Sequence, residues 1–286
     1  MNRVFKVIWN HTKGCYVVVA ETAKNMTKRS SLSVVFSKMV GATAVAVMLT
    51  GVMMPTDALG APITRGNGAQ AENDGGIAIG DNTASKGDYS ISIGTNASVG
   101  RGDTDEGKTQ SGIAIGQGAT VTVDVNKGKD VPANQRTGGI AIGQGATTKV
   151  VNAIAVGSGT SADGAQAVTI GHNSRSTTNN SVALGNETRV ASTNGFALGN
   201  NARAGYDENN QLIGLDNDQA FGSNARAYGG SSMAFGNDAK SSGGGAVSIG
   251  NGSQSRGDWA VAIGNGSKAL KQGSSALGTN ATTNSS

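Results

Sequence analysis

The chain lacks most of what an ordinary globular core is built from. Its 286 residues include one cysteine, three prolines and only 4% aromatic residues, against 45 glycines. This balance does not fit the composition of one or two conventional globular domains. Collagen is excluded as well, because the glycines never keep an every-third-residue spacing.

Cysteine and histidine are too scarce for metal or nucleophile chemistry. Cys15 is the sole cysteine and lies in the N-terminal leader, so the mature chain has no thiol for a disulfide or a metal site. His172, beside Asn173, is the one histidine after the leader and is interpreted as a turn residue. Because the carboxylates are scattered, no triad, metal cluster or carboxylate pair can be assembled. We therefore predict no catalytic residue, no metal and no cofactor, and do not expect an enzyme.

Positive charge is concentrated at the N-terminus. Residues 1–60 hold seven of the 23 Lys and Arg and two of the 19 Asp and Glu, which leaves 16 basic and 17 acidic residues in 61–286. The formal net charge of +4 therefore comes from the leader. A nearly neutral mature chain gives no support to nucleic-acid binding.

The leader ends in an uncharged segment. Residues 39–54 carry no charge, and Ala58-Leu59-Gly60 places small residues at the two positions that a signal peptidase reads. These 16 residues are fewer than the roughly 20 that a membrane-spanning helix needs. We interpret 39–60 as the hydrophobic core and cleavage site of a signal peptide cleaved near Gly60, after an extended region over 1–38.

The mature chain is dominated by an internal repeat. A small residue flanked by two mostly apolar residues and followed by glycine occurs thirteen times, from Ile77-Ala78-Ile79-Gly80 to Ser275-Ala276-Leu277-Gly278. Nine of the twelve intervals between the closing glycines are 14 residues. Such a period with apolar residues at i and i+2 predicts an all-β stack of 14-residue coils, a parallel β-solenoid, over 76–286. Residues 61–75 are interpreted as a polar lead-in.

Each coil carries a second pattern after its glycine. Small residues stand three and five positions on, with a variable residue between them, as in Ala202-Arg203-Ala204. The two patterns predict two strands in each coil. One strand would pack its large apolar residues inside, and the other would pack Ala, Ser or Thr. Two buried large side chains would contribute roughly 3–6 kcal/mol per coil, less than ordering the coil costs. Because a single roll would be underfilled, we expect a homo-oligomer.

Three intervals are longer than the period. They place insertions near 99–112, 120–139 and 205–218. The first contains Arg101-Gly102-Asp103, where integrin-type recognition and a chance polar loop are both open interpretations. The other two carry apolar residues around Gly or Asn and are predicted to protrude as hairpins. A second tripeptide of the same kind, Arg256-Gly257-Asp258, is interpreted as the corner before a strand.

The variable position, four residues after each glycine, is predicted to point outward because both neighbours are inward small residues. Six of seven consecutive coils carry a cation there, namely Arg175, Arg189, Arg203, Arg226, Lys240 and Lys268. These cations form either a solvated strand face that discourages aggregation or a basic stripe that docks an extended polyanion, such as a sulfated glycan.

Two segments resemble a known family. The leader, through Phe5-Lys6-Val7-Ile8-Trp9-Asn10, Val18 and Glu21, resembles the extended signal peptide region of large Gram-negative autotransporters. Together with the repeats, it resembles the trimeric autotransporter adhesins and their YadA-like head, whose repeat reads approximately Asn-Ser-Val-Ala-Ile-Gly. Residues Asn180 to Gly185 nearly reproduce that repeat. The resemblance implies a left-handed parallel β-roll, assembled as a homotrimer and displayed on the bacterial outer membrane.

The resemblance also implies a function. We expect a surface-exposed adhesin head that binds host extracellular-matrix or cell-surface molecules through repeated contacts, with collagen-like ligands pointing to Asn180 and Ser181. The alternative is a structural spacer or self-association module without a specific ligand. Family members continue into a stalk and a membrane anchor that this chain lacks, so we expect a fragment or a truncated product. The sequence does not identify the ligand.

Overall fold

The computed structural model describes Phe5–Asn10, Cys15–Ala20 and residues 62–72, 75–100, 111–122 and 138–284. The chain divides into two compact units, Met1–Asp57 and Ala58–Ser286. In the first unit, β1 (Phe5–Asn10) pairs antiparallel with β2 (Cys15–Ala20). No helix in the described parts of the chain is long and apolar enough to cross a membrane.

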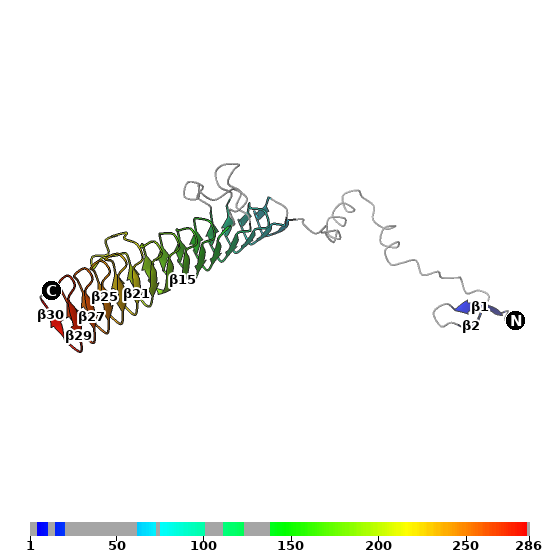
Figure 1. The fold of residues 1–286 in the computed structure, drawn as a ribbon. Helices are drawn as coiled ribbons and strands as arrows, with labels where there is room; N and C mark the ends of the chain where they lie inside the picture. Colours follow the sequence, from blue (N-terminus) through cyan, green and yellow to red (C-terminus); the bar gives the residue numbers. More distant parts are fainter. Residues whose placement is uncertain are drawn as a thin grey trace. The chain divides into compact units, whose positions relative to one another are not determined.

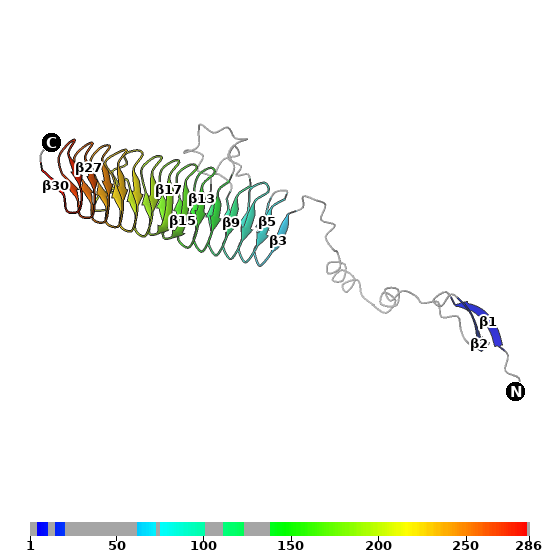
Figure 2. The same ribbon diagram turned by 60° about the horizontal axis from the view of Figure 1, so that its bottom comes forward.

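The second unit is a stack of coils, each of which contributes one strand to each of two sheets (Figure 1). Both sheets have 14 strands, and every strand pairs in parallel with its counterpart one coil away. The expected parallel β-solenoid is therefore confirmed. Figure 2 shows the same succession of coils from β3 to β30.

The two sheets are named here by the numbers of their strands. The odd sheet holds β3 (Ile63–Arg65), β5 (Ile77–Ile79), β7 (Ile91–Ile93), β9 (Ile113–Ile115), β11 (Ile140–Ile142), β13 (Ile154–Val156), β15 (Val168–His172), β17 (Val182–Asn186), β19 (Phe196–Leu198), β21 (Gln219–Phe221), β23 (Met233–Phe235), β25 (Val247–Ile249), β27 (Val261–Ile263) and β29 (Ser275–Leu277). The even sheet holds β4 (Gln70–Ala71), β6 (Ala84–Ser85), β8 (Ser98–Val99), β10 (Thr120–Val121), β12 (Thr147–Thr148), β14 (Ser161–Ala162), β16 (Arg175–Ser176), β18 (Arg189–Val190), β20 (Arg203–Ala204), β22 (Arg226–Ala227), β24 (Lys240–Ser241), β26 (Gln254–Ser255), β28 (Lys268–Ala269) and β30 (Thr282–Thr283).

The segment 61–75, expected as a lead-in, supplies a further coil. Ile63 to Arg65 pair with β5, and Gln70 and Ala71 pair with β6. Gly66 takes the place of a closing glycine, with φ +127°. The repeat phrase missed this coil because an arginine stands where the second apolar residue should be.

The closing glycine of each coil is fixed by a close approach of backbones. Its φ lies between +113° and +144° throughout the stack, a region that side-chain-bearing residues rarely adopt. A Cβ added to Gly250 would lie 2.4 Å from the carbonyl oxygen of Gly264, in the next coil. Both constraints require glycine, which explains why the phrase always ends in this residue.

Asparagine occupies many of the other sharp corners. Asn180, Asn194 and Asn201 all have φ between +53° and +56°, which asparagine tolerates better than most residues. Their side chains also bond from coil to coil, since Asn180 Nδ2 donates to Asn194 Oδ1 at 3.3 Å. Asn186 donates in the same way to Asn200 at 2.9 Å. The corners therefore add side-chain ladders to the backbone ladders.

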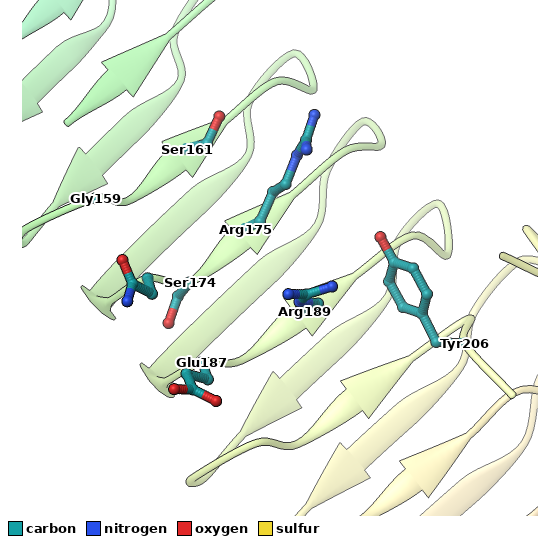
Figure 3. A pocket seen from close by; sticks show the side chains of 8 residues that line it. Gly159, Ser161, Ser174, Arg175, Glu187, Arg189 and Tyr206 are labelled. Atoms are coloured by element: carbon teal, nitrogen blue, oxygen red, sulfur yellow. The ribbon is translucent and has the colours of Figure 1, made fainter. Parts of the chain in front are cut away.

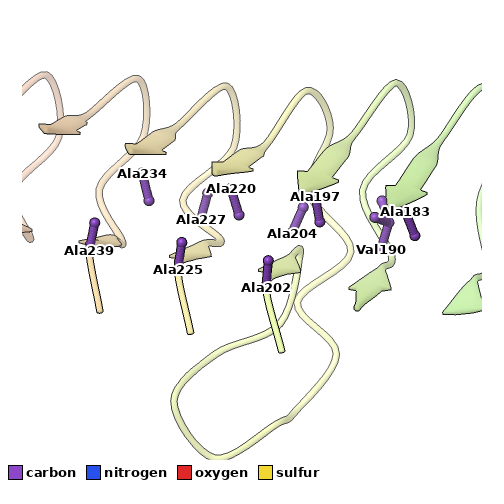
Figure 4. Close-up of a cluster of buried hydrophobic side chains, with 10 residues drawn as sticks. All are labelled: Ala183, Val190, Ala197, Ala202, Ala204, Ala220, Ala225, Ala227, Ala234 and Ala239. Atoms are coloured by element: carbon purple, nitrogen blue, oxygen red, sulfur yellow. The ribbon is translucent and has the colours of Figure 1, made fainter. Parts of the chain in front are cut away.

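The interior of the coils is built from small side chains. In the coil that contains Gly185, the side chains of Ser181, Ala183, Thr188 and Val190 are fully buried. Figure 4 shows the same arrangement in successive coils, where alanines of the two sheets point toward each other. Such an interior has no room for a second row of large residues.

The expectation that the large apolar residues fill the coils is wrong. The strand alternation puts the middle, small residue inside and its large neighbours on the outer face of the odd sheet. Val182 and Leu184, expected inside, are half-buried there. Ile170 and Phe235 are 42% and 54% exposed in the single chain. The large residues thus form an apolar outer face.

Three aromatic residues reinforce this face. The rings of Phe196 and Phe221 stack with centroids 5.1 Å apart, and Phe221 contacts Phe235 at 5.8 Å. We call these three side chains the aromatic row. They lie on consecutive odd strands, β19, β21 and β23, so the row runs along the stack.

The two kinds of glycine predict different costs of substitution. Gly250→Ala is expected to destabilise the stack by more than about 2 kcal/mol, because the added Cβ clashes with the next coil. Gly252→Ala is the matched control in the same coil, since its Cβ would meet nothing within 4 Å, and about 1–2 kcal/mol is expected from its φ of +65°. Unfolding monitored by circular dichroism measures both. Equal losses would contradict the role given to the close backbone approach.

Candidate functional site

The even sheet brings the predicted cations into one line. We call Arg175, Arg189, Arg203, Arg226, Lys240 and Lys268 the cationic ladder. The first five pair directly from strand to strand, and Gln254 stands between Lys240 and Lys268. Arg175, Arg189 and Lys268 are exposed. The register predicted from the sequence is confirmed, and the outward orientation holds for these three side chains.

Arg203 departs from the expected outward exposure. Its residue is only 7% exposed, because the insertion at 205–218 covers it. The guanidinium donates through Nη2 and Nε to Asn201 Oδ1 at 2.7 and 3.1 Å, and through Nη1 to Asn210 Oδ1. Burial lowers the pKa of Arg203, and the neighbouring charges of Arg189 and Arg226 lower it further.

The insertion at 205–218 is a hairpin-like loop that folds back on the ladder. A single antiparallel bridge joins Tyr206 and Leu212, in agreement with the predicted hairpin. The loop does not simply protrude, because Arg226 Nη1 donates to the carbonyl oxygens of Asp207 and Glu208 at 2.6 and 2.9 Å. The Glu208 carboxylate lies 3.4 Å from Lys240 Nζ. The loop thus binds three consecutive cations of the ladder.

Asp163 binds the ladder at its other end. Arg175 donates to Asp163 Oδ2 through Nη2 at 2.7 Å and Nε at 3.0 Å, and Lys149 Nζ lies 3.3 Å from Oδ1. Burial alone would raise the pKa of Asp163, but hydrogen bonds from Ser161 and Arg175 and the two cations hold it below its usual value. The repeat pattern does not mark Asp163, although this residue stands one coil before Arg175 and two positions after Ser161.

A cavity opens over the exposed part of the ladder. It has a volume of about 530 Å³ and lies between β14, β16 and β18 on one side and the start of the insertion on the other (Figure 3). Arg175, Arg189 and Tyr206 line it together with Gly159, Ser161, Asn173, Ser174 and Glu187. Among the described residues, Arg189 and Lys268 are the two ladder cations whose side chains make no hydrogen bond or ion pair. Of these two, Arg189 lines the cavity and Lys268 does not.

Other predicted site residues are placed less favourably for binding. Asn180 is an exposed corner residue, whereas Ser181 is fully buried and its Oγ donates to the carbonyl of Thr178 at 2.6 Å. Ser181 therefore cannot reach a ligand, because the small residues before each odd strand face the interior. His172, expected as a turn residue, is instead the last residue of β15, and its Nδ1 lies 3.0 Å from Oδ1 of its pairing partner Asn186.

Only the second of the two Arg-Gly-Asp tripeptides lies in the part of the chain that the structure describes. Arg101, Gly102 and Asp103 lie outside the described residues, as does most of the insertion near 120–139. The second tripeptide, Arg256-Gly257-Asp258, forms the corner before β27, as expected. Asp258 Oδ1 accepts a hydrogen bond from the Gly244 N–H at 2.8 Å, so this carboxylate holds the turn. In the described ranges, no three His, Cys, Asp or Glu side chains gather to hold a metal ion.

A buried carboxylate marks the place where the insertion rejoins the coil. Asp218 is fully buried, and its Oδ1 accepts hydrogen bonds from the Gly230 N–H at 2.9 Å and from the N–H and Oγ of Ser232 at 3.1 and 2.7 Å. Its Oδ2 has no partner. Burial raises the pKa of Asp218, and these hydrogen bonds offset the effect only in part. An ionised Asp218 is therefore unfavourable for the fold.

Matches to known families support the division into leader and coils. Residues 1–50 match the model described as the extended signal peptide of the type V secretion system. The model of the YadA head domain repeat, which spans two copies, matches residues 66–83, 71–97, 137–160, 162–188, 220–239, 227–253 and 256–281. The matched ranges leave out 189–219, which contains Arg189, Arg203 and the insertion.

The two buried carboxylates predict opposite effects of pH. Asp218 has a raised pKa in the folded state, so its contribution to stability is present at acidic pH and lost as pH rises through that pKa. Asp218→Asn should remove this loss, and its unfolding temperature should gain on that of the unaltered protein as pH rises from acidic to neutral. Thermal unfolding across this range measures the difference.

Asp163→Asn is the matched control. The pKa of Asp163 is lowered in the folded state, so its contribution is present above the unfolded value of 3.8 and is lost as pH falls through the folded pKa. The Asp163 variant should therefore lose most stability at neutral pH and least in acid. If both variants shifted in the same direction with pH, the assignment of the two carboxylates would be wrong.

Proposed function

The chain belongs to the trimeric autotransporter adhesins with YadA-type heads, and we propose that residues 62–284 form the ligand-binding head of a homotrimer. It is an exported protein of the bacterial cell surface, and its family is in general non-enzymatic. The finer proposal is that the head binds host extracellular-matrix proteins or sulfated glycans through contacts repeated along its coils. Collagen-like ligands are included on the strength of the family resemblance.

The apolar outer face of the odd sheet is the observation that carries this proposal. Residues such as Leu198, Phe235 and Leu277 are 44%, 54% and 66% exposed in a single chain. Continuous apolar surface of this kind marks an interaction site, because a soluble monomer rarely exposes it. Association of three copies through the odd sheets would bury the rows of Ile, Val, Leu and Phe. The family supplies the number three.

Association through the odd sheet would leave the even sheet for ligands. Each coil would then present the same side of its even strand, and three copies would present three such sheets. Weak contacts repeated in this way gain strength from their number, because binding one site raises the effective concentration at the next. The exposed corner Asn180 and the exposed members of the cationic ladder lie on the surface available for these contacts.

A spacer or self-association module is the second candidate function. It is favoured by the contacts of Arg203, Arg226 and Lys240 with the insertion, since cations already bound within the chain are less available to a ligand. A module of this class would promote cell settling without binding any one matrix component. The two candidates therefore differ in a direct assay.

The aromatic row tests the assembly. Replacing Phe196, Phe221 and Phe235 with Asp should convert the homotrimer to monomers, because buried unpaired carboxylates would be placed in the interface. Ala84, Thr120 and Gln254, which lie on the even sheet and do not pair with one another, are replaced with Asp in the control, and the trimer should persist. Sedimentation velocity at micromolar concentration measures both, with circular dichroism to verify the β fold. A folded, monomeric unaltered protein would overturn the assembly.

Binding assays test the adhesive function. The mature head is expected to bind at least one of immobilised collagen, laminin and fibronectin in a solid-phase assay, with a loss of binding in the monomeric triple variant because avidity is lost. Cell-settling assays on bacteria that display the head provide the comparison. Settling without binding to any of the three proteins would favour the self-association module instead.

A further inference from the structure

We infer that the cavity bounded by Arg175, Arg189 and Tyr206 is a subsite for one anionic group of a host saccharide, a sulfate or a carboxylate. The inference rests on the proposed adhesive function and narrows it to one place on the even sheet. Within the cationic ladder, Arg189 is then the residue that contacts the ligand. Arg175, Arg203, Arg226 and Lys240 are bound by other groups of the same chain.

The occupation of the neighbouring cations is the first argument. Arg175 donates two hydrogen bonds to Asp163 Oδ2, and Arg203, Arg226 and Lys240 are bound by the insertion or by Asn201. Arg189 stands between Arg175 and Arg203, roughly 4.8 Å from each strand, without a hydrogen bond or ion pair of its own. An unpaired guanidinium between two others is a strong site for an oxyanion, because its planar fork can donate two parallel hydrogen bonds.

Tyr206 is the second, independent argument. The residue is only 9% exposed and lines the cavity, where no hydrogen bond within the described part of the chain occupies its hydroxyl. Figure 3 shows the Tyr206 ring standing beside Arg189 at the wall of the cavity. The hydroxyl is not a buried atom left without a partner, so it is free to hydrogen-bond from the cavity side. A ligand group held by Arg189 would accept a hydrogen bond from it.

The remaining lining explains why a saccharide fits better than an isolated ion. The volume of about 530 Å³ lies within the range of small-molecule sites and exceeds what one sulfate would fill. Ser161, Asn173 and Glu187 offer hydroxyl, amide and carboxylate groups of the kind that bond sugar hydroxyls. Glu187 also disfavours a second anionic group beside it. The site therefore suits a saccharide with one anionic group among neutral hydroxyls.

The insertion sets the limit of the subsite. Its first residues supply Tyr206, and its next residues cover Arg203 and bind Arg226. A long polyanion cannot lie along the whole ladder while this loop is in place. This differs from the stripe considered in the sequence analysis, in which four arginines would contribute alike.

The test is the affinity of the mature homotrimer for three probes at low salt. A sulfated heparin-derived oligosaccharide, a hyaluronan oligosaccharide with carboxylates only, and neutral dextran of similar length are titrated by calorimetry. Binding of either anionic probe, but not of dextran, is expected, and the preference between the two identifies sulfate or carboxylate. Absence of binding to both anionic probes would overturn the subsite, and the proposed function would stand if the matrix proteins still bound.

Three variants locate the site. Arg189→Gln should weaken binding by about tenfold or more, because a charge-assisted pair of hydrogen bonds is lost. Lys268→Gln is the matched control, an exposed ladder cation outside the cavity, and less than about twofold is expected. Tyr206→Phe should weaken binding by about threefold while it keeps the ring.

The outcomes are decisive only for folded variants. Unfolding temperatures are therefore compared first, and Arg189 is expected to be replaceable without loss because it supports no contact. Equal weakening by Arg189→Gln and Lys268→Gln would overturn the subsite and indicate a general attraction to the even sheet. Arg189→Lys keeps the charge but not the fork, so affinity midway between those of the unaltered protein and Arg189→Gln would support bidentate recognition.

Discussion

The close approach of each coil to the next determines the other features of this head. Strands pair in register one coil away, so a residue that suits one coil stands on its equivalent in the neighbours. Between Gly66 and Gly264, each closing glycine lies so near the next one that a Cβ would collide with its backbone. The spacing leaves a narrow interior, which small side chains fill. The glycine-rich, aromatic-poor composition follows from this geometry.

The narrow interior also decides where the large residues lie. A strand with two large residues and a small one between them can turn either face inward, and only the small face fits opposite the Ala, Ser and Thr of the even sheet. The large residues are left outside, where a single chain cannot bury them. An underfilled roll and an exposed apolar face both favour association. The exposed face also indicates that the odd sheet is the surface through which the copies associate. The odd sheet is thereby committed to the partner subunits in the proposed homotrimer.

The period and the register could be predicted from the sequence, because the repeat phrase and the glycine spacing report directly on the coils. The orientation of the odd strands could not, since alternation defines two faces without saying which is inside. The burial of Arg203 depends on the path of an insertion that follows no period. Asp163 was missed because its importance comes from Arg175 and Lys149, which reach it from neighbouring coils. Contacts made between coils by irregular residues are invisible to a periodic pattern.

Like charges in register explain why the ladder has the partners it has. Stacked cations about 4.8 Å apart repel each other, so an in-register row is tolerated only where other groups compensate it. Asp163 compensates one end, and the carbonyls and Glu208 of the insertion compensate the middle. Lys268 lies beside Gln254 and has no cation directly paired with it. Arg189 is the exception, flanked by two arginines and bound by neither acid nor amide. The proposed subsite uses this difference, because the neighbours of Arg189 are compensated within the chain while its guanidinium stays open to an anionic group.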